Sequence, residues 1–71
     1  MRRTPVTSSH LRSIGYDAAT QILEVEFISG EVYQYQDVPG GEYRNLLDAS
    51  SHGQYFNEHI KDTYQAQRVT Q

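Results

Sequence analysis

The sequence predicts an α+β fold: a three-stranded antiparallel meander followed by two helices that pack on one face of the sheet. Two patterns lead to this prediction. Apolar and polar residues alternate between positions 22 and 36, which is typical of half-buried strands. Between positions 39 and 65 the apolar residues recur every three or four positions, which is typical of helices with one buried face. Because the connections are short, we expect antiparallel neighbours and helices on one side.

The first strand is expected to begin after Ser8 and to bury Leu11, Ile14 and Tyr16. The spacing of three between Leu11 and Ile14 breaks the alternation, which either a β-bulge or a strand start near His10 would explain. Asp17 then opens a turn, because an aspartate side chain can accept a hydrogen bond from the backbone two residues later.

The second and third strands are expected to form a hairpin, and the length of its loop decides where two tyrosines lie. A two-residue loop would set Tyr33 and Tyr35 opposite glutamates on the polar side. A three-residue loop would set them opposite Val25 and Leu23, beneath the helices. Gly30, at the end of the loop, suits the three-residue form, because that loop closes with a left-handed residue. The sequence therefore favours tyrosines that pack under the helices.

The helices are predicted from their boundary residues and their spacing. Pro39 suits the first turn of the first helix, where a missing N–H costs nothing. Ser51 and Gln54 match a capping box, so we expect the second helix to run from about His52 to Gln65. The apolar stripe of that helix is expected at Phe56, Ile60 and Tyr64.

Length and composition bound the organisation of the chain. Its 71 residues suffice for one domain. We expect residues 1–7 to be a flexible arm, residues 8–66 to be the domain, and residues 67–71 to be a loose tail. The chain has no cysteine, which excludes disulfides, thiolate metal sites and a cysteine nucleophile. No apolar run approaches the roughly 20 residues that span a bilayer. We therefore expect a soluble, cytoplasmic protein with no membrane partner and no cofactor.

The titratable residues do not predict an enzyme. His10, His52 and His59 are expected to be surface or capping residues, because zinc needs three or four convergent ligands. Glu24 and Glu26 alternate with apolar residues, and we expect them on a solvated strand face. A carboxylate pair for acid–base chemistry would instead need a cleft and two different environments.

Together these motifs resemble the KTSC domain, a family named for its occurrence at the C-terminus of some lysyl-tRNA synthetases. The resemblance covers residues 8 to about 64. It is carried by Ser8, Ser9, Ile14, Gly15, Tyr16, Asp17, Leu23, Val25, Phe27, Gly30, Tyr33, Gln34, Tyr35, Val38, Pro39, Ala49, Ser50, Gly53, Gln54, Tyr55, Phe56, Asn57, Ile60, Lys61 and Tyr64.

Most of the family motif is expected to be structural. Ser50 is explained by close packing between the helices, and Gly53 by a need for space. Asn57 is expected to bond across to the loop near residues 15–17. The positions expected to be structural are Gly15, Tyr16, Tyr33, Tyr35, Pro39, Ser50, Gly53, Phe56, Asn57 and Tyr64.

The synthetase context of the family implies RNA as a partner, and this makes a non-catalytic RNA or nucleoprotein binding module our first hypothesis. The net charge of −3 means that phosphate contacts would have to come from a local basic patch. A protein-interaction module that uses a sheet edge or a helix face is the alternative. A small-molecule binder or enzyme with a pocket near Tyr16, Tyr33 and Asn57 is the third hypothesis. The residues predicted to contact nucleic acid are Arg12, Arg44, Lys61 and Arg68.

Overall fold

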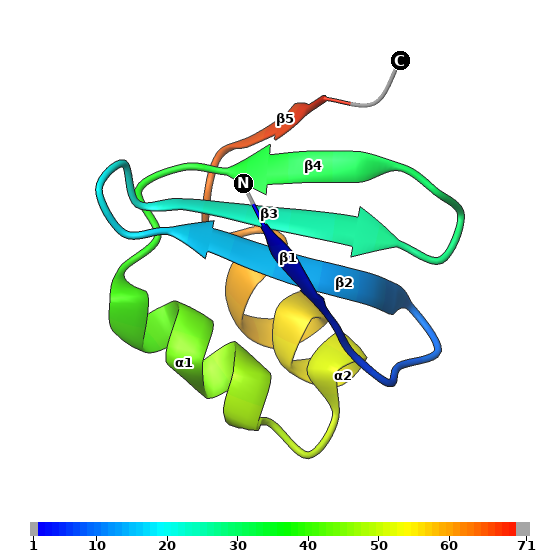
Figure 1. Ribbon diagram of the computed structural model, residues 1–71. Helices are drawn as coiled ribbons and strands as arrows, with labels where there is room; N and C mark the ends of the chain where they lie inside the picture. Colours follow the sequence, from blue (N-terminus) through cyan, green and yellow to red (C-terminus); the bar gives the residue numbers. More distant parts are fainter. Residues whose placement is uncertain (1, 70–71) are drawn as a thin grey trace.

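The computed structural model describes residues 2–69 as a five-stranded antiparallel sheet with a helical layer against one face (Figure 1). The strands are adjacent in the order of the sequence: β1 (Arg3–Pro5), β2 (Leu11–Asp17), β3 (Ile22–Phe27), β4 (Val32–Tyr35) and β5 (Ala66–Arg68). Between β4 and β5 come α1 (Gly40–Asp48), α2 (His52–Tyr55) and a π-helical turn η1 (Phe56–Ile60), which continues α2 directly. The α+β class and the two helices are confirmed.

The predicted number of strands is wrong. Strands β2, β3 and β4 form the expected meander, but an edge strand is added on each side of it. One of them, β1, comes from the segment expected to be a flexible arm, and β5 comes from residues at the junction of the predicted domain and tail. Each has only three residues and neither shows an alternating pattern. They pair because β2 and β4 offer them backbone donors and acceptors, which a search for local periodicity does not detect.

Pro5 is compatible with β1 because of the direction in which its nitrogen points. The neighbouring Val6 N–H donates to the Arg12 carbonyl over 3.1 Å, and Pro5 itself lies opposite Ser13. Backbone groups alternate in direction along an antiparallel strand, so the Pro5 nitrogen faces away from β2. Proline is tolerated at such an outward position of an edge strand. It also limits further strand pairing at this edge of the sheet.

The β3–β4 loop has three residues, as the sequence favours. The Phe27 N–H donates to the Glu31 carbonyl over 2.9 Å, and the Gly30 N–H donates back to the Phe27 carbonyl over 2.9 Å. Gly30 has a φ of 99°, a conformation that side chains with a Cβ rarely adopt. This is a type I turn closed by a left-handed glycine.

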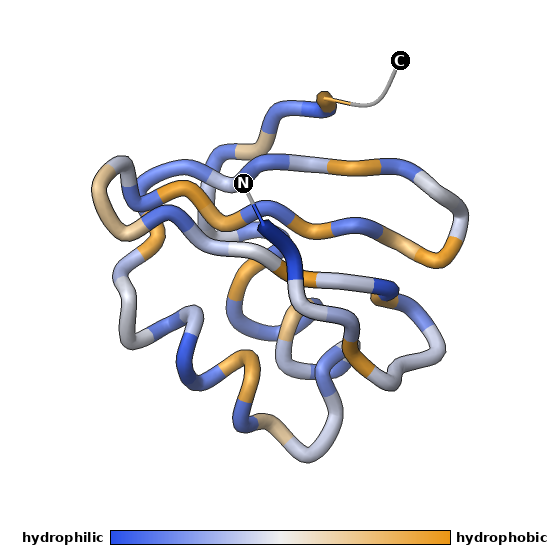
Figure 2. Tube along the Cα trace, in the orientation of Figure 1, coloured by the Kyte–Doolittle hydropathy of each residue, from blue (hydrophilic) through white to orange (hydrophobic). Residues whose placement is uncertain are grey.

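The loop sets the register that places the two tyrosines on the helical side. Tyr33 lies opposite Val25, and Tyr35 lies opposite Leu23. Hydrophobic and hydrophilic residues alternate along this hairpin, as Figure 2 shows. Tyr35 is 5% exposed and belongs to the core, whereas Tyr33 is half-buried. The predicted orientation of both tyrosines is confirmed.

The core lies between the sheet and the helices. A register shift between Leu11 and Ser13 shows that a bulge, the first of the two explanations, interrupts the alternation, and it keeps Leu11 and Ile14 buried together. The buried apolar cluster consists of Leu11, Ile14, Leu23, Val25, Tyr35, Val38, Leu46, Phe56 and Ile60.

The helix boundaries follow most of the expected signals. Pro39 is the N-cap of α1, directly before the first helical residue. The Ser51 hydroxyl accepts a hydrogen bond from the Gln54 N–H over 3.2 Å, which caps α2 as predicted. The helical segment ends earlier than Gln65, because η1 gives way to turns after Ile60. Ser50 is exposed between the helices, so its predicted packing role is wrong.

Gly15 allows β1 to cross closely over β2. A Cβ at Gly15 would lie 2.7 Å from the Arg2 carbonyl oxygen, and the backbone there cannot yield without moving β1. Gly15→Ala should therefore lower the free energy of unfolding by about 1–3 kcal/mol. Urea denaturation measures this change. Gly41→Ala is the matched control, since a Cβ at Gly41 meets nothing within 4 Å and alanine favours a helix by up to about 1 kcal/mol. Equal midpoints for Gly15→Ala and the unmutated protein would contradict the prediction.

Candidate functional site

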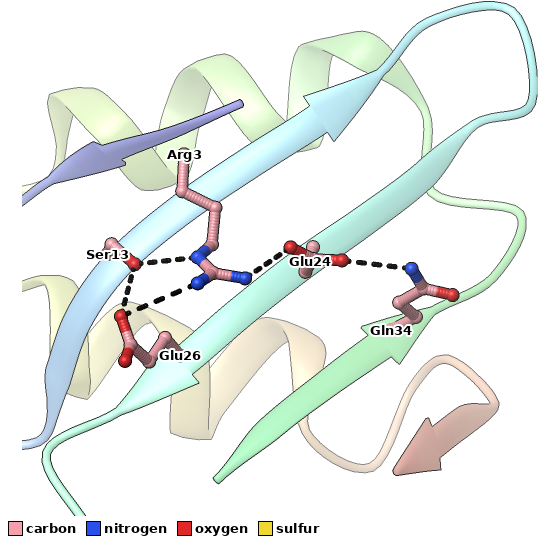
Figure 3. A network of polar contacts seen from close by, with 5 residues as sticks. All are labelled: Arg3, Ser13, Glu24, Glu26 and Gln34. Atoms are coloured by element: carbon pink, nitrogen blue, oxygen red, sulfur yellow. Dashed lines mark hydrogen bonds and ion pairs between the residues drawn. The ribbon is translucent and has the colours of Figure 1, made fainter. Parts of the chain in front are cut away.

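The sheet face opposite the helices is occupied by a network of polar contacts (Figure 3). Arg3 reaches across from β1 and donates from Nη1 to Glu24 Oε2 over 2.5 Å and from Nε to Ser13 Oγ over 3.0 Å. Ser13 in turn donates to Glu26 Oε1 over 2.8 Å. On the other side, Gln34 Nε2 donates to Glu24 Oε1 over 2.9 Å. The guanidinium thus joins β1 to β2 and β3.

This network corrects the expectation of a solvated carboxylate face. Glu24 is only 7% exposed, because Arg3 and its strand cover it. Both carboxylate oxygens of Glu24 are engaged by neighbouring side chains. The arrangement therefore serves to attach β1 to the sheet.

The helical side carries a different feature, an open hollow of about 520 Å³ whose walls are aromatic. It lies between the β3–β4 hairpin, the turn before β2 and the end of η1. We call it the aromatic hollow, and it is lined by Ser9, His10, Phe27, Ile28, Ser29, Glu31, Tyr33, Tyr35, Phe56 and Lys61.

Edge-to-face packing fixes the rings of this hollow. The Phe27 ring lies 5.7 Å from that of Tyr33 and 5.4 Å from that of Phe56, at interplanar angles of 81° and 73°. The rings of Tyr35 and Phe56 are also 5.4 Å apart, at 83°. Such perpendicular contacts stabilise the rings beyond the effect of their burial. Because Phe27 and Tyr33 are half-buried, each leaves part of its ring surface open.

Two of the four basic residues predicted to contact nucleic acid lie at the aromatic hollow. Lys61 lines it directly. Arg68 lies opposite Tyr33 in the sheet, and its Nη2 is 3.4 Å from Glu31 Oε2. Arg12 donates from Nη2 to the backbone carbonyl of Ile28 over 3.0 Å, but it borders a separate hollow with Arg3, Ser13 and Glu26.

Arg44 lies elsewhere. It borders a separate hollow with Tyr16 and Tyr43, which stack at a centroid distance of 4.9 Å. The Tyr16 hydroxyl donates to the Val38 carbonyl over 2.5 Å, which ties β2 to the segment before α1. Asn57 is exposed on η1, and it makes no hydrogen bond to residues 15–17 in the described part of the chain. The predicted contact of Asn57 is therefore wrong, and the pocket expected near Tyr16, Tyr33 and Asn57 is not among the hollows described for this structure.

Gly53 and the histidines make local packing contacts. A Cβ at Gly53 would lie 3.3 Å from His10 Nδ1 and 3.4 Å from Ser8 Oγ, so the helix approaches the turn before β2 closely. His52 Nε2 is 3.2 Å from the Leu47 carbonyl at the end of α1. The His59 ring lies 4.4 Å from that of Tyr55. Among residues 2–69 no group of three histidine, aspartate or glutamate side chains could hold a metal ion.

Glu42 is a residue whose role the sequence did not indicate. Its two carboxylate oxygens accept hydrogen bonds from the Tyr55 hydroxyl and, over 2.9 Å, from the Tyr64 hydroxyl. The hydrogen bond to Glu42 raises the pKa of Tyr55. Burial, followed by the same carboxylate, raises the pKa of Tyr64. Glu42 thus links α1 to α2 and to the turn that follows η1.

Sequence reasoning also missed three residues of the aromatic hollow. Phe27 lies diagonal to Tyr33 in the hairpin register, and this position could have indicated a shared aromatic wall. Glu31 and Ile28 belong to the loop region, and nothing in their spacing points to a hollow. Their position depends on how η1 packs beneath the hairpin.

The fold and the hollow define a small α+β domain with an aromatic surface site. Comparison with known proteins identifies the family of this domain. The family model described as the KTSC domain matches residues 7–64. The crystal structure of a KTSC domain protein from Yersinia pestis superimposes with a TM-score of 0.95 at 36% identity, and 97% of each chain is covered. The chain belongs to the KTSC domain family, as its motifs predicted.

Two relatives show the contexts in which similar domains occur. An uncharacterized protein of Stutzerimonas stutzeri (strain A1501) is 51% identical over 61 residues, which cover 86% of each chain. A lysine–tRNA ligase of Nostoc punctiforme is 37% identical over 62 residues, which cover 87% of this chain and 11% of the ligase. The chain therefore resembles a small segment of that larger protein. Within residues 2–69, none of the helices has the length and apolar character needed to cross a membrane.

The Arg3 network generates a prediction about stability. Arg3→Ala should lower the free energy of unfolding by about 1–3 kcal/mol, because it leaves a buried carboxylate without its charged partner. Glu24→Gln in the Arg3→Ala background should restore part of the lost free energy of unfolding, since the amide leaves no unpaired charge buried. Arg44→Ala is the control, and this exposed change should stay within about 0.5 kcal/mol. Urea denaturation of the four proteins would show whether the Arg3 and Arg44 variants differ; equal effects would rule out the proposed role of Arg3.

Burial, followed by the nearby Tyr33 and Asp62, raises the pKa of Tyr35 from 10.0 to about 12. Unfolded Tyr35 therefore loses its proton at a lower pH than folded Tyr35 does. Between pH 10 and 12 the unfolded state binds fewer protons, so the free energy of unfolding should fall as pH rises through this window. Thermal melts between pH 10 and 12 should show that the melting temperature of Tyr35→Phe falls less steeply with pH than that of the unmutated protein. Tyr43→Phe should show the same steep fall as the unmutated protein. Equal slopes of melting temperature against pH in the two variants would contradict the raised pKa of Tyr35.

Proposed function

We propose that this domain is a non-catalytic binding module that takes single-stranded RNA, with one unpaired base seated in the aromatic hollow. The observation that carries the proposal is the combination in one place of partly open aromatic rings and basic side chains. Phe27 and Tyr33 provide the rings, and Lys61 stands at the wall of the same hollow.

Stacking would supply much of the binding free energy. A base stacked on an aromatic side chain contributes about 1–3 kcal/mol, and every base has a ring face that can do this. The volume of about 520 Å³ lies in the range of sites for small molecules, so it has room for a single base. Bases in duplex RNA are paired and stacked already, which is why unpaired bases are the better ligands.

The basic residues would act through the phosphates that flank the base. Lys61 lines the hollow, and Arg68 lies opposite Tyr33 in the sheet. These contacts are local, because the chain as a whole carries a net charge of −3. Arg44 and Arg12 each border another hollow, so we leave both out of the proposed interface.

Relatives add independent support for RNA over other ligands. The segment that this chain resembles in Nostoc punctiforme belongs to a protein named as a lysine–tRNA ligase, and that name specifies an RNA substrate. The proposal places the domain in the cytoplasm, where such RNA is available.

A protein-interaction module is the second candidate, and one observation favours it. Ile28 is 45% exposed at the border of the aromatic hollow, where an apolar side chain of a peptide could contact it. Catalysis is the weakest candidate. Ser9 Oγ lies 3.1 Å from His10 Nδ1, but in the described part of the chain no third group orients the imidazole as nucleophilic catalysis requires.

Titration of short single-stranded RNA into the isotope-labelled domain, followed by amide chemical shifts, tests the proposal. Shifts should concentrate at residues 27–35 and 56–61, and binding should weaken steeply with added salt. Lys61→Gln should weaken binding and reduce the salt slope by about one, whereas Arg44→Gln should leave both unchanged. Tyr33→Leu should weaken binding about fivefold or more, whereas Tyr33→Phe should retain it, because phenylalanine keeps the ring.

Three outcomes would reject the proposal. The first is an absence of amide chemical-shift changes at high protein concentration, which would favour a protein partner that contacts Ile28. The second is a set of shifts confined to the opposite face, around Glu24 and Gln34. The third is equal binding by the Lys61→Gln and Arg44→Gln variants.

A further inference from the structure

Glu31 is the acidic side chain among the residues that line the aromatic hollow. It lies directly after the hairpin loop, two positions before Tyr33, and its side chain is 44% exposed. One of its oxygens, Oε2, is 3.4 Å from Arg68 Nη2. Within residues 2–69 the other oxygen has no hydrogen-bond partner. The carboxylate is therefore held at the hollow with acceptor sites to spare, since its two oxygens offer about four lone-pair positions.

A carboxylate next to a stacked base discriminates between bases by its chemistry. It can only accept hydrogen bonds. Guanine presents two adjacent donors on its pairing edge, the ring N1–H and the exocyclic amine, which match the two oxygens of a carboxylate. Adenine and cytosine each place an acceptor next to their amine, and uracil has acceptors on both sides of its ring N–H. These acceptors would face the negative charge and be repelled.

The charges around the hollow also orient the nucleotide. Glu31 and Lys61 both line it but come from different elements, the hairpin and the end of η1. A phosphate is attracted to Lys61 and repelled by Glu31, so the backbone would pass on the lysine side. The base edge would then point toward Glu31.

We propose that the aromatic hollow selects guanine at the stacked position, with Glu31 as the residue that determines specificity. This proposal rests on the proposed function, because it requires a base in the hollow. It adds the base identity, which stacking alone leaves open.

The test compares single-stranded uridine-rich RNAs that differ only at one central base, titrated into the full chain. The guanine RNA should bind at least about fivefold more tightly than the adenine, cytosine and uracil forms. A difference of about fivefold is the lower limit of the discrimination that a bidentate contact to a base provides. Inosine at the same position lacks the exocyclic amine, and it should lose much of the preference. Glu31→Gln should bind all four RNAs within about twofold of one another, because a glutamine amide offers both a donor and an acceptor.

Glu58→Gln is the matched control, since it removes the same charge from an exposed site outside the aromatic hollow, and it should keep the guanine preference. Guanine preference that persists in Glu31→Gln, or equal affinity of the unmutated protein for all four bases, would overturn the specificity proposal while leaving the RNA proposal intact. Failure of every RNA to bind would overturn both.

Discussion

The left-handed conformation of Gly30 is the constraint on which most of this structure depends. Its φ of 99° closes a three-residue loop, and the loop sets the register between β3 and β4. A change of one residue in that register would carry every side chain of β4 to the other face. Tyr33 and Tyr35 would then lie beside glutamates, and the helices would face glutamine. Both the core and the aromatic hollow therefore depend on one backbone conformation.

The two faces of the sheet differ in how their charged side chains are paired. On the open face, Arg3 and Gln34 hold the Glu24 carboxylate within an internal network. On the helical face, Lys61 stands exposed at the aromatic hollow, and Arg68 pairs with Glu31 at its border. Negative charge is thus neutralised inside the sheet surface, while positive charge is left where aromatic rings are open.

The parts of the fold that could be predicted are those coded within a few residues. Alternation defined β3 and β4, the glycine defined the loop, and Ser51 defined the start of α2. The edge strands could not be predicted, because their pairing comes from neighbouring backbone. The burial of Glu24 was missed for the same reason: its partner Arg3 lies 21 residues away. At the candidate site, Lys61 and Arg68 were selected from the sequence, but the sequence did not indicate that both lie at one hollow.

The sequence alone determined the periodicity of the strands and helices, the loop type and the side of the sheet on which the tyrosines lie. Each of these follows from backbone preferences and side-chain spacing that act over a few residues. Tertiary structure alone decided that the Arg3 side chain pairs with Glu24, that β5 brings Arg68 to Glu31, and that η1 presents Lys61 to the same hollow. These contacts join segments distant in the chain, and they form only because the helices and sheet share one core.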